Sequence, residues 1–267
     1  MSELRQNLIT RDWVIIATER AKRPDEFANK KKLMVAVPPY RADCPFCVGN
    51  EEDGTLETFR LGDDGTGWKV RAIGNKYPAL SPTAEWMRIS SGIHRTMAGI
   101  GVHEVIVEHR RHDLTTALLT VEEVTDILLV YRQRYVEIRK YPHIETIIIF
   151  KNHGESAGTS LEHPHSQIAA TPVVPSLFRS RIDAAIRYFD DTGECLFCRT
   201  LEDELASGER VIFETEHFVA FIPYAALSPF HIWIFPRRHS SSFDDITDAE
   251  ITDLAYILKT VLAKDRD

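Results

Sequence analysis

The residues best suited to chemistry lie in one short segment, His163-Pro164-His165-Ser166-Gln167. A neutral imidazole attacks phosphorus at neutral pH, and the phosphoramidate that results is a labile carrier of the group. Alternation along an apolar strand that opens here predicts His163, His165 and Gln167 on one face. One histidine can then serve a metal ion while His165 attacks a phosphate. The amide of Gln167 can donate to the phosphoryl oxygens as charge builds in the transition state.

The preceding loop contains small and hydroxylated residues: Gly154, Ser156, Gly158, Thr159 and Ser160. Small residues let the backbone approach a ligand closely, and backbone amides and hydroxyls suit phosphate oxygens. A competing interpretation is that both histidines bind metal or cap the strand inertly. The loop and Gln167 favour the catalytic interpretation.

The four cysteines form two Cys-x-x-Cys pairs, and the first is Cys44 and Cys47. Two thiolates on one tight turn suit tetrahedral zinc, and a closed structural site needs two further ligands. The candidates are His112 and His163. The alternatives are a reactive dithiol or two unrelated buried thiols, but the second copy of the motif favours zinc.

The second pair, Cys195 and Cys198, has His239 as its obvious third ligand. Its fourth ligand should come from a closing strand beyond the last helix. We therefore expect a second zinc site that is open, partly occupied or empty.

Hydrophobic periodicity predicts the elements that position these residues. Val and Ile enrichment predicts strands at 13–17, 68–73, 103–108, 144–150, 217–222 and 229–235. Helical spacing of apolar residues predicts helices at 121–141, 176–190 and 248–264. Thr247 is a plausible N-cap for the last of these helices.

An internal repeat emerges when these elements are aligned. Each half has a Cys-x-x-Cys pair, strands, a histidine after a strand and a long helix. The predicted fold is α+β with two related halves, each an antiparallel sheet with a long helix packed on it. The halves are residues 1–175, with the zinc site and the catalytic histidine, and residues 176–267. The second half is expected to be incomplete, because a closing strand does not follow its helix.

The 267 residues have a formal net charge of −8, with 43% hydrophobic and 27% charged residues. This balance is ordinary for a globular protein and argues against binding nucleic acid through bulk positive potential. No long apolar segment or secretory signal is evident, so we expect a cytoplasmic protein with no membrane partner.

The His-Pro-His-Ser-Gln segment, with Cys-Pro-Phe-Cys upstream, resembles the galactose-1-phosphate uridylyltransferase family of the histidine-triad superfamily. The likeness covers nearly the whole chain, and includes the stretches 7–14, 20–24, 74–80 and 150–167. It implies double displacement, in which His165 takes UMP from UDP-glucose and passes it to galactose 1-phosphate. It also implies a homodimer and a structural zinc on Cys44, Cys47, His112 and His163.

The resemblance assigns roles to further residues. Gln167 and Ser160 would hold the phosphoryl oxygens, and Asn75 and Asn152 match positions near the nucleoside. Arg20 and Arg23 would contact phosphate. Two guanidiniums at this spacing can bind a sugar phosphate bidentately, although a solvated basic patch is the plainer interpretation of the residues alone.

Other functions remain open at this point. Some similar proteins act on ADP-glucose with phosphate, so an ADP-sugar or dinucleotide phosphorylase is the first alternative. A non-catalytic zinc protein that binds nucleotides is an alternative of another class, and plain hydrolysis is a fourth. The resemblance to these relatives leaves both the base and the acceptor open. It also leads us to expect a C-terminal truncation, which would remove a family segment that carries much of the hexose recognition.

Overall fold

The computed structural model describes residues 3–16, 37–51, 55–62, 67–159 and 161–264. They form two compact units. One comprises Val37–Val174 with Ser241–Leu262, and the other comprises Pro175–Ser240 with the described parts of Met1–Ala36 and Ala263–Asp267. Among the described helices, none is both long and apolar enough to cross a membrane.

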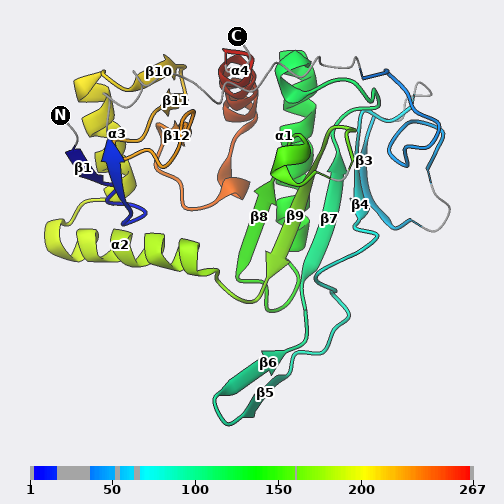
Figure 1. Ribbon diagram of the computed structural model, residues 1–267, viewed down its shortest axis with the longest axis horizontal. Coiled ribbons are helices and arrows are strands. Elements are labelled where there is room, and N and C mark those ends of the chain that lie inside the picture. Colours follow the sequence, from blue (N-terminus) through cyan, green and yellow to red (C-terminus); the bar gives the residue numbers. More distant parts are fainter. Residues whose placement is uncertain (1–2, 17–36, 52–54, 63–66, 160, 265–267) are drawn as a thin grey trace, which may run out of the picture. The chain divides into compact units, whose positions relative to one another are not determined.

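A five-stranded antiparallel sheet forms the centre of the first unit (Figure 1). Its strands lie in the order β3 (Glu57–Leu61), β4 (Val70–Gly74), β7 (Val102–Val107), β9 (His165–Thr171) and β8 (Thr146–Phe150). The strand that carries His165 therefore has a hydrogen-bonded neighbour on both sides. This arrangement holds its backbone, and hence its side-chain directions, more firmly than an edge position would.

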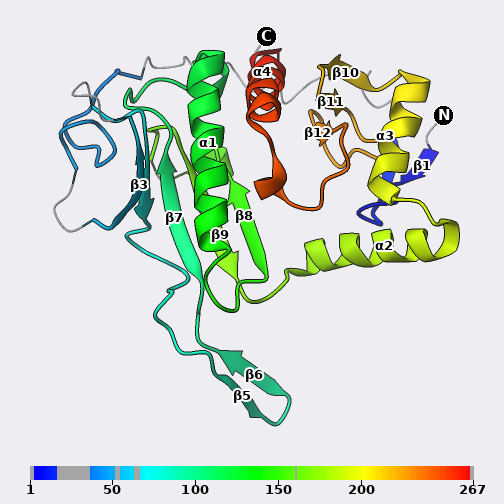
Figure 2. The same cartoon turned by 180° about the vertical axis from the view of Figure 1, so that it is seen from behind.

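Helix α1 (Val121–Ile138) packs along one face of this sheet (Figures 1 and 2). It begins at a capping box, in which the Thr120 hydroxyl accepts from the Glu123 amide and the Glu123 carboxylate accepts from the Thr120 amide. Its apolar stripe meets the inward side chains of the strands in one core. The fully buried members include Ile106, Leu119, Val130, Ile138 and Ile168.

Helix α4 (Asp248–Lys264) contributes Ile251 and Ala255 to the same core. The Glu250 amide donates to the Thr247 hydroxyl at 3.2 Å, which confirms Thr247 as the N-cap. The described residues of this unit also form three 3-10 turns, η2 (Thr116–Leu118), η3 (Glu155–Ala157) and η4 (Phe243–Asp245). A hairpin of β5 (Arg88–Ser91) and β6 (His94–Met97) extends from the lower end of the sheet in Figure 1.

The described part of the second unit contains two small antiparallel sheets and two helices. Strands β1 (Glu3–Gln6) and β2 (Trp13–Ile16) form a hairpin, and β10 (Val211–Glu214), β11 (Phe218–Phe221) and β12 (Trp233–Pro236) form a three-stranded sheet. Helix α2 (Ser176–Thr192) ends at Gly193, and helix α3 (Leu196–Ser207) ends at Gly208; both glycines have left-handed φ angles.

The α+β fold with antiparallel sheets and packed helices is confirmed. The three helices expected from periodicity are present, and their starting residues match. Helix α3 was not predicted, because its Cys-x-x-Cys segment was expected to lead directly into strands as in the first half. The chain uses the second pair differently, with Cys195 as the N-cap residue and Cys198 in the first turn of a helix.

Candidate active site

Strand β9 divides its side chains between the two faces of the sheet. Ser166, Ile168 and Ala170 are buried on the side of α1, whereas His165 and Gln167 are half-buried on the opposite face. This alternation places His165 and Gln167 together, as predicted for these two residues. His163 differs, because it precedes the strand and its ring is directed into a buried cluster of cysteine and histidine side chains.

The imidazole of His165 is held in one tautomer. Its Nδ1 atom lies 2.7 Å from the backbone oxygen of His163. A carbonyl oxygen only accepts, so Nδ1 carries the hydrogen and Nε2 carries the lone pair. Within the described part of the chain, Nε2 has no hydrogen-bond partner, and the Phe46 ring packs against the imidazole at a centroid distance of 5.5 Å. The ring is therefore oriented, and the described residues leave the lone pair of Nε2 outside any hydrogen bond.

Gln167 lies in a polar group with two residues of neighbouring segments. Its Oε1 atom is 2.9 Å from His103 Nε2 and 3.4 Å from Asn75 Nδ2. Asn75, which the family resemblance places near the nucleoside, thus contacts the proposed phosphate-binding amide directly. No role for His103 was evident in the sequence, since one polar residue near the start of a strand is common.

The loop after β8 contains the predicted phosphate-binding residues. Gly154 and Gly158 have φ angles of 82° and 78°, and a Cβ atom at either position would meet open space. The Oγ1 atom of Thr159 is buried and has no hydrogen-bond partner among the described residues. Asn152 is exposed. Ser160, Arg20 and Arg23 lie outside the described residues.

A buried polar network supports β9 from the side of α1. The Tyr131 hydroxyl lies 2.6 Å from Ser166 Oγ and 3.1 Å from Glu108 Oε1, and Lys151 donates to the other oxygen of Glu108. Burial, reinforced by the Glu108 charge, raises the pKa of Tyr131 well above its ordinary value, so the phenol stays protonated and can donate. These contacts connect the start of β9 to α1 and to the loop after β8.

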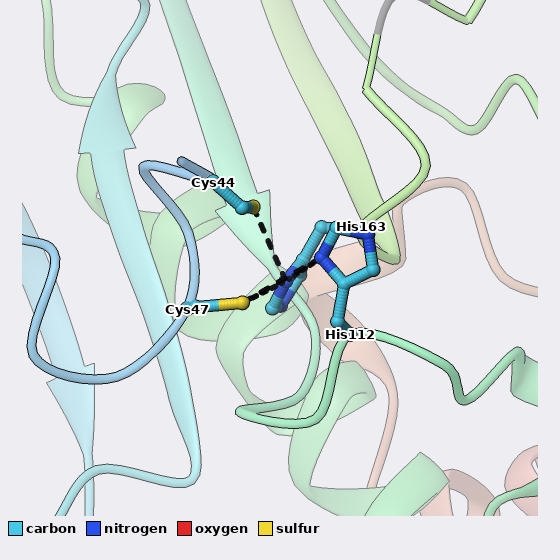
Figure 3. A group of neighbouring side chains, drawn as sticks. All are labelled: Cys44, Cys47, His112 and His163. Atoms are coloured by element: carbon cyan, nitrogen blue, oxygen red, sulfur yellow. Dashed lines mark hydrogen bonds between the residues drawn. The ribbon is translucent and has the colours of Figure 1, made fainter. Parts of the chain in front are cut away.

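Four buried side chains converge near the start of β9: Cys44, Cys47, His112 and His163 (Figure 3). Their ligand atoms all lie within 4.8 Å of one another. The distances from sulfur to Nδ1 are 3.5, 3.6 and 3.7 Å, and the two Nδ1 atoms are 3.3 Å apart.

These separations match the edges of a zinc tetrahedron. With Zn–S near 2.3 Å and Zn–N near 2.05 Å, tetrahedral angles give S···N of about 3.6 Å and N···N of about 3.3 Å. Two thiolates and two imidazoles are also a common donor set of structural zinc. The group can therefore hold a metal ion, and its donor atoms and spacings fit zinc.

The backbone prepares His163 as a ligand. Its Nε2 atom donates to the His109 carbonyl at 2.7 Å, which leaves the lone pair on Nδ1, the atom that faces the cysteines. Burial lowers the pKa of His163 to about 4; neighbouring His112 and His165 add to this, and the His109 carbonyl opposes it. The ring is consequently neutral at pH 7, as a metal ligand must be.

The second cysteine pair also meets its predicted partner. Cys195, Cys198 and His239 place their ligand atoms within 4.8 Å of one another, and Cys198 Sγ lies 3.1 Å from His239 Nδ1. In contrast to the first group, none of the three is buried. Within the described residues, the group offers three ligands rather than four.

Sequence comparisons relate this chain to one protein family over nearly its whole length. The family model for the N-terminal domain of galactose-1-phosphate uridyl transferase matches residues 1–175, and that for the C-terminal domain matches residues 181–267. An ADP-glucose phosphorylase of Arabidopsis thaliana is 41% identical over 98% of this chain and 73% of its own length. A galactose-1-phosphate uridylyltransferase of Thermotoga maritima is 31% identical over 99% of this chain and 76% of its own length.

The solved structures that resemble this chain include proteins of the same two kinds. The crystal structure of an ADP-glucose phosphorylase from Arabidopsis thaliana with bound ADP-glucose superimposes with a TM-score of 0.80 at 37% identity, covering 98% of this chain and 76% of that one. A uridylyltransferase structure superimposes with a TM-score of 0.72 at 27% identity, covering 97% and 73%. The fold is that of a family of proteins that transfer nucleotidyl groups to or from sugar phosphates. The chain belongs to the galactose-1-phosphate uridyl transferase family.

Proposed function

We propose that His165 takes a nucleoside monophosphate from a nucleotide sugar and passes it to a second phosphate. The observation that carries this proposal is the tautomer of His165, in which the His163 carbonyl holds Nδ1–H and leaves Nε2 with a lone pair. An oriented neutral imidazole beside an amide donor is suited to nucleophilic catalysis at phosphorus.

The chemistry proceeds by double displacement. Nε2 of His165 forms a bond to the α-phosphorus, and the bond from that phosphorus to the sugar phosphate oxygen breaks. The imidazole becomes positively charged, and the His163 carbonyl stabilises this charge through the Nδ1–H hydrogen bond. The Gln167 amide donates to the phosphoryl oxygens. Attack by the acceptor phosphate then reverses these bond changes and frees His165.

For the donor and acceptor we propose ADP-glucose and inorganic phosphate. The similarity to an ADP-glucose phosphorylase, at 41% identity over nearly the whole chain, supports this choice. Transfer of UMP between UDP-glucose and galactose 1-phosphate is the second candidate, and the 31% identity to the Thermotoga maritima uridylyltransferase supports it. Ser160, Arg20, Arg23 and Asn152 complete the proposed substrate contacts.

We further propose that Cys44, Cys47, His112 and His163 hold a structural zinc ion. When bound, zinc would stabilise both thiolates and lock the turn before β9, but it takes no part in nucleotidyl transfer. Cys195, Cys198 and His239 are proposed as a second, weaker site. We also propose that the protein acts in the cytoplasm as a homodimer, with functional domains at 1–175 and 176–267.

Intact mass spectrometry under non-acidic conditions tests the function. Purified protein is mixed with ADP-glucose, or separately with UDP-glucose, in the absence of acceptor. We expect an adenylyl adduct, which is lost in His165→Asn and kept in the control His94→Asn, because His94 lies exposed on the β5–β6 hairpin. Inorganic phosphate added afterwards should remove the adduct.

The alternatives give different masses. A uridylyl adduct that only galactose 1-phosphate removes would promote the second candidate. If folded, zinc-loaded protein forms no adduct with either donor, the enzymatic proposal is wrong and a nucleotide-binding role remains.

A further inference from the structure

The orientation of Gln167 decides whether it can assist catalysis. An amide side chain has one accepting oxygen and one donating nitrogen, and a half-turn about its last bond exchanges them. Phosphoryl oxygens only accept, so Gln167 helps in just one of the two orientations. A residue that selects this orientation would affect catalysis without touching the substrate.

Two donors converge on the oxygen of Gln167. His103 Nε2 lies 2.9 Å and Asn75 Nδ2 lies 3.4 Å from Gln167 Oε1. The two nitrogens are 3.2 Å apart, because they approach the same oxygen. With Oε1 engaged on this side, the Nε2 hydrogens of Gln167 are left for other acceptors.

Backbone amides determine that both neighbours are donors. The Ala79 amide lies 3.0 Å from His103 Nδ1, and a backbone N–H can only donate, so Nδ1 accepts and the ring hydrogen is on Nε2. The Tyr77 amide likewise donates to Asn75 Oδ1 at 2.9 Å, which leaves the Asn75 Nδ2 hydrogens for Gln167. The direction of every hydrogen bond in this group thus follows from the Ala79 and Tyr77 backbone amides, because these can only donate.

The loop that supplies these amides is anchored at both ends. The Asn75 amide donates to the His103 carbonyl at 3.0 Å. Ser81 pairs with the segment before β7, since its amide donates to Gly99 at 2.8 Å and its carbonyl accepts from Gly101 at 3.0 Å. The loop is therefore held over the start of β7, where His103 lies.

The same contact recurs in the second half of the chain. Trp233 pairs with Phe221 as Val105 pairs with Ile73, so His231 and Leu227 occupy the positions of His103 and Ala79. The Leu227 amide lies 3.1 Å from His231 Nδ1. The other ring nitrogen faces the Trp233 indole N–H at 3.1 Å instead of a glutamine, and because this second partner also only donates, these two contacts do not select one tautomer of His231 as those of His103 do. The amide-to-histidine contact is part of the repeat, and only the first half couples it to a catalytic strand.

We propose that His103 is a positioning residue that orients the Gln167 amide toward the phosphoryl group in nucleotidyl transfer. The inference rests on the proposed function, in which Gln167 donates to that group. His103 acts through the hydrogen bond from its Nε2, and Asn75 reinforces the same orientation.

A first test determines the tautomer of His103 directly and does not depend on catalytic activity. ¹⁵N NMR of histidine-labelled protein distinguishes protonated from unprotonated ring nitrogens, and His103→Gln assigns the resonance. We expect Nε2 of His103 to carry the hydrogen and Nδ1 to lack it at pH 7.5. The Nδ1–H tautomer, or a doubly protonated ring, would overturn the proposal whether or not the protein is active.

A second test measures adduct formation on His165 in single turnovers. We expect His103→Phe to lower the maximal rate by about tenfold to a hundredfold, as for a weakened oxyanion donor, with little change in donor affinity. His103→Gln keeps an N–H near the position of Nε2 and should restore most of the rate. His231→Phe, the matched change in the second half, should leave the rate unaltered.

A double-mutant cycle separates positioning from general damage. In a Gln167→Leu background there is no amide to orient, so His103→Phe should cost less than threefold. An equal loss in both backgrounds, or a wild-type rate in His103→Phe, would refute the proposal. Absence of any adduct in the wild-type protein would instead count against the proposed function, and the NMR result would still decide the tautomer.

Discussion

At the scale of single residues, backbone groups select the hydrogen position of three histidines. The His163 carbonyl sets His165, the His109 carbonyl sets His163, and the Ala79 amide sets His103. An isolated imidazole exchanges its two neutral tautomers freely. Each of these contacts therefore lowers the population of the tautomer that does not suit the role proposed for the residue. The proposed nucleophile, metal ligand and positioning residue thus differ in which ring nitrogen carries the hydrogen or in what that nitrogen contacts, although all three are histidines.

A buried ion pair gives a stability prediction at this scale. Arg134 on α1 donates to both oxygens of Glu104 on β7, at 2.7 and 2.8 Å, and both side chains are buried. Arg134→Met leaves the carboxylate unpaired in the core and should lower the free energy of unfolding by about 3–5 kcal/mol.

The double variant Arg134→Met/Glu104→Leu removes both charges and should recover most of this loss, as measured by urea denaturation. If the single and double variants are equally destabilised, packing rather than the unpaired charge is responsible.

At the scale of elements, the approach of β7 to β9 depends on one glycine. Gly101 precedes β7 with a φ of 149°, and a Cβ atom there would lie 2.1 Å from the Ala170 carbonyl oxygen of β9. Backbone atoms cannot yield to that overlap without moving the strand. The strand pair that carries His103 and Gln167 therefore requires glycine at this position.

Gly101→Ala should consequently destabilise the protein by more than about 3 kcal/mol, or prevent folding. Gly74→Ala is the matched control in the same sheet, because its Cβ atom would meet Leu56 at an ordinary 3.7 Å. We expect a change below about 1 kcal/mol for this control. Equal melting temperatures for the two variants would contradict the prediction.

At the scale of the whole chain, the first cysteine–histidine group joins three distant segments. Cys44 and Cys47 lie in the turn before β3, His112 follows β7, and His163 precedes β9. A bound ion would hold together loops separated by 51 to 119 residues, which favours the folded state.

Metal analysis tests this prediction. We expect about one tightly held zinc ion per chain after dialysis, lost in Cys44→Ser but retained in Cys195→Ser. A strong chelator should lower the melting temperature of the wild-type protein. If zinc content and melting temperature are the same in Cys44→Ser as in the wild type, the assignment of this site is wrong.

Much of the site could be predicted from local sequence, because it depends on short-range geometry. The period of two along β9 predicts that His165 and Gln167 share a face, and apolar spacing with a capping threonine predicts α1 and α4. Cys-x-x-Cys followed by histidine predicts the two groups of ligand atoms. The strand, helix and cysteine-pair signals arise from residues a few positions apart, whereas the histidines of the two groups lie 41 to 119 residues from the cysteines that they meet.

Only the tertiary structure determined which partners these residues meet. His103 approaches Gln167 because β7 pairs with β9 in one register, and 64 residues separate the two side chains. The tautomer of His165 depends on the His163 carbonyl in the turn before β9, and the tautomer of His163 depends on the His109 carbonyl just after β7. Sequence determined the chemical groups and their faces, whereas long-range strand pairing decided which hydrogen-bond donors and acceptors orient them.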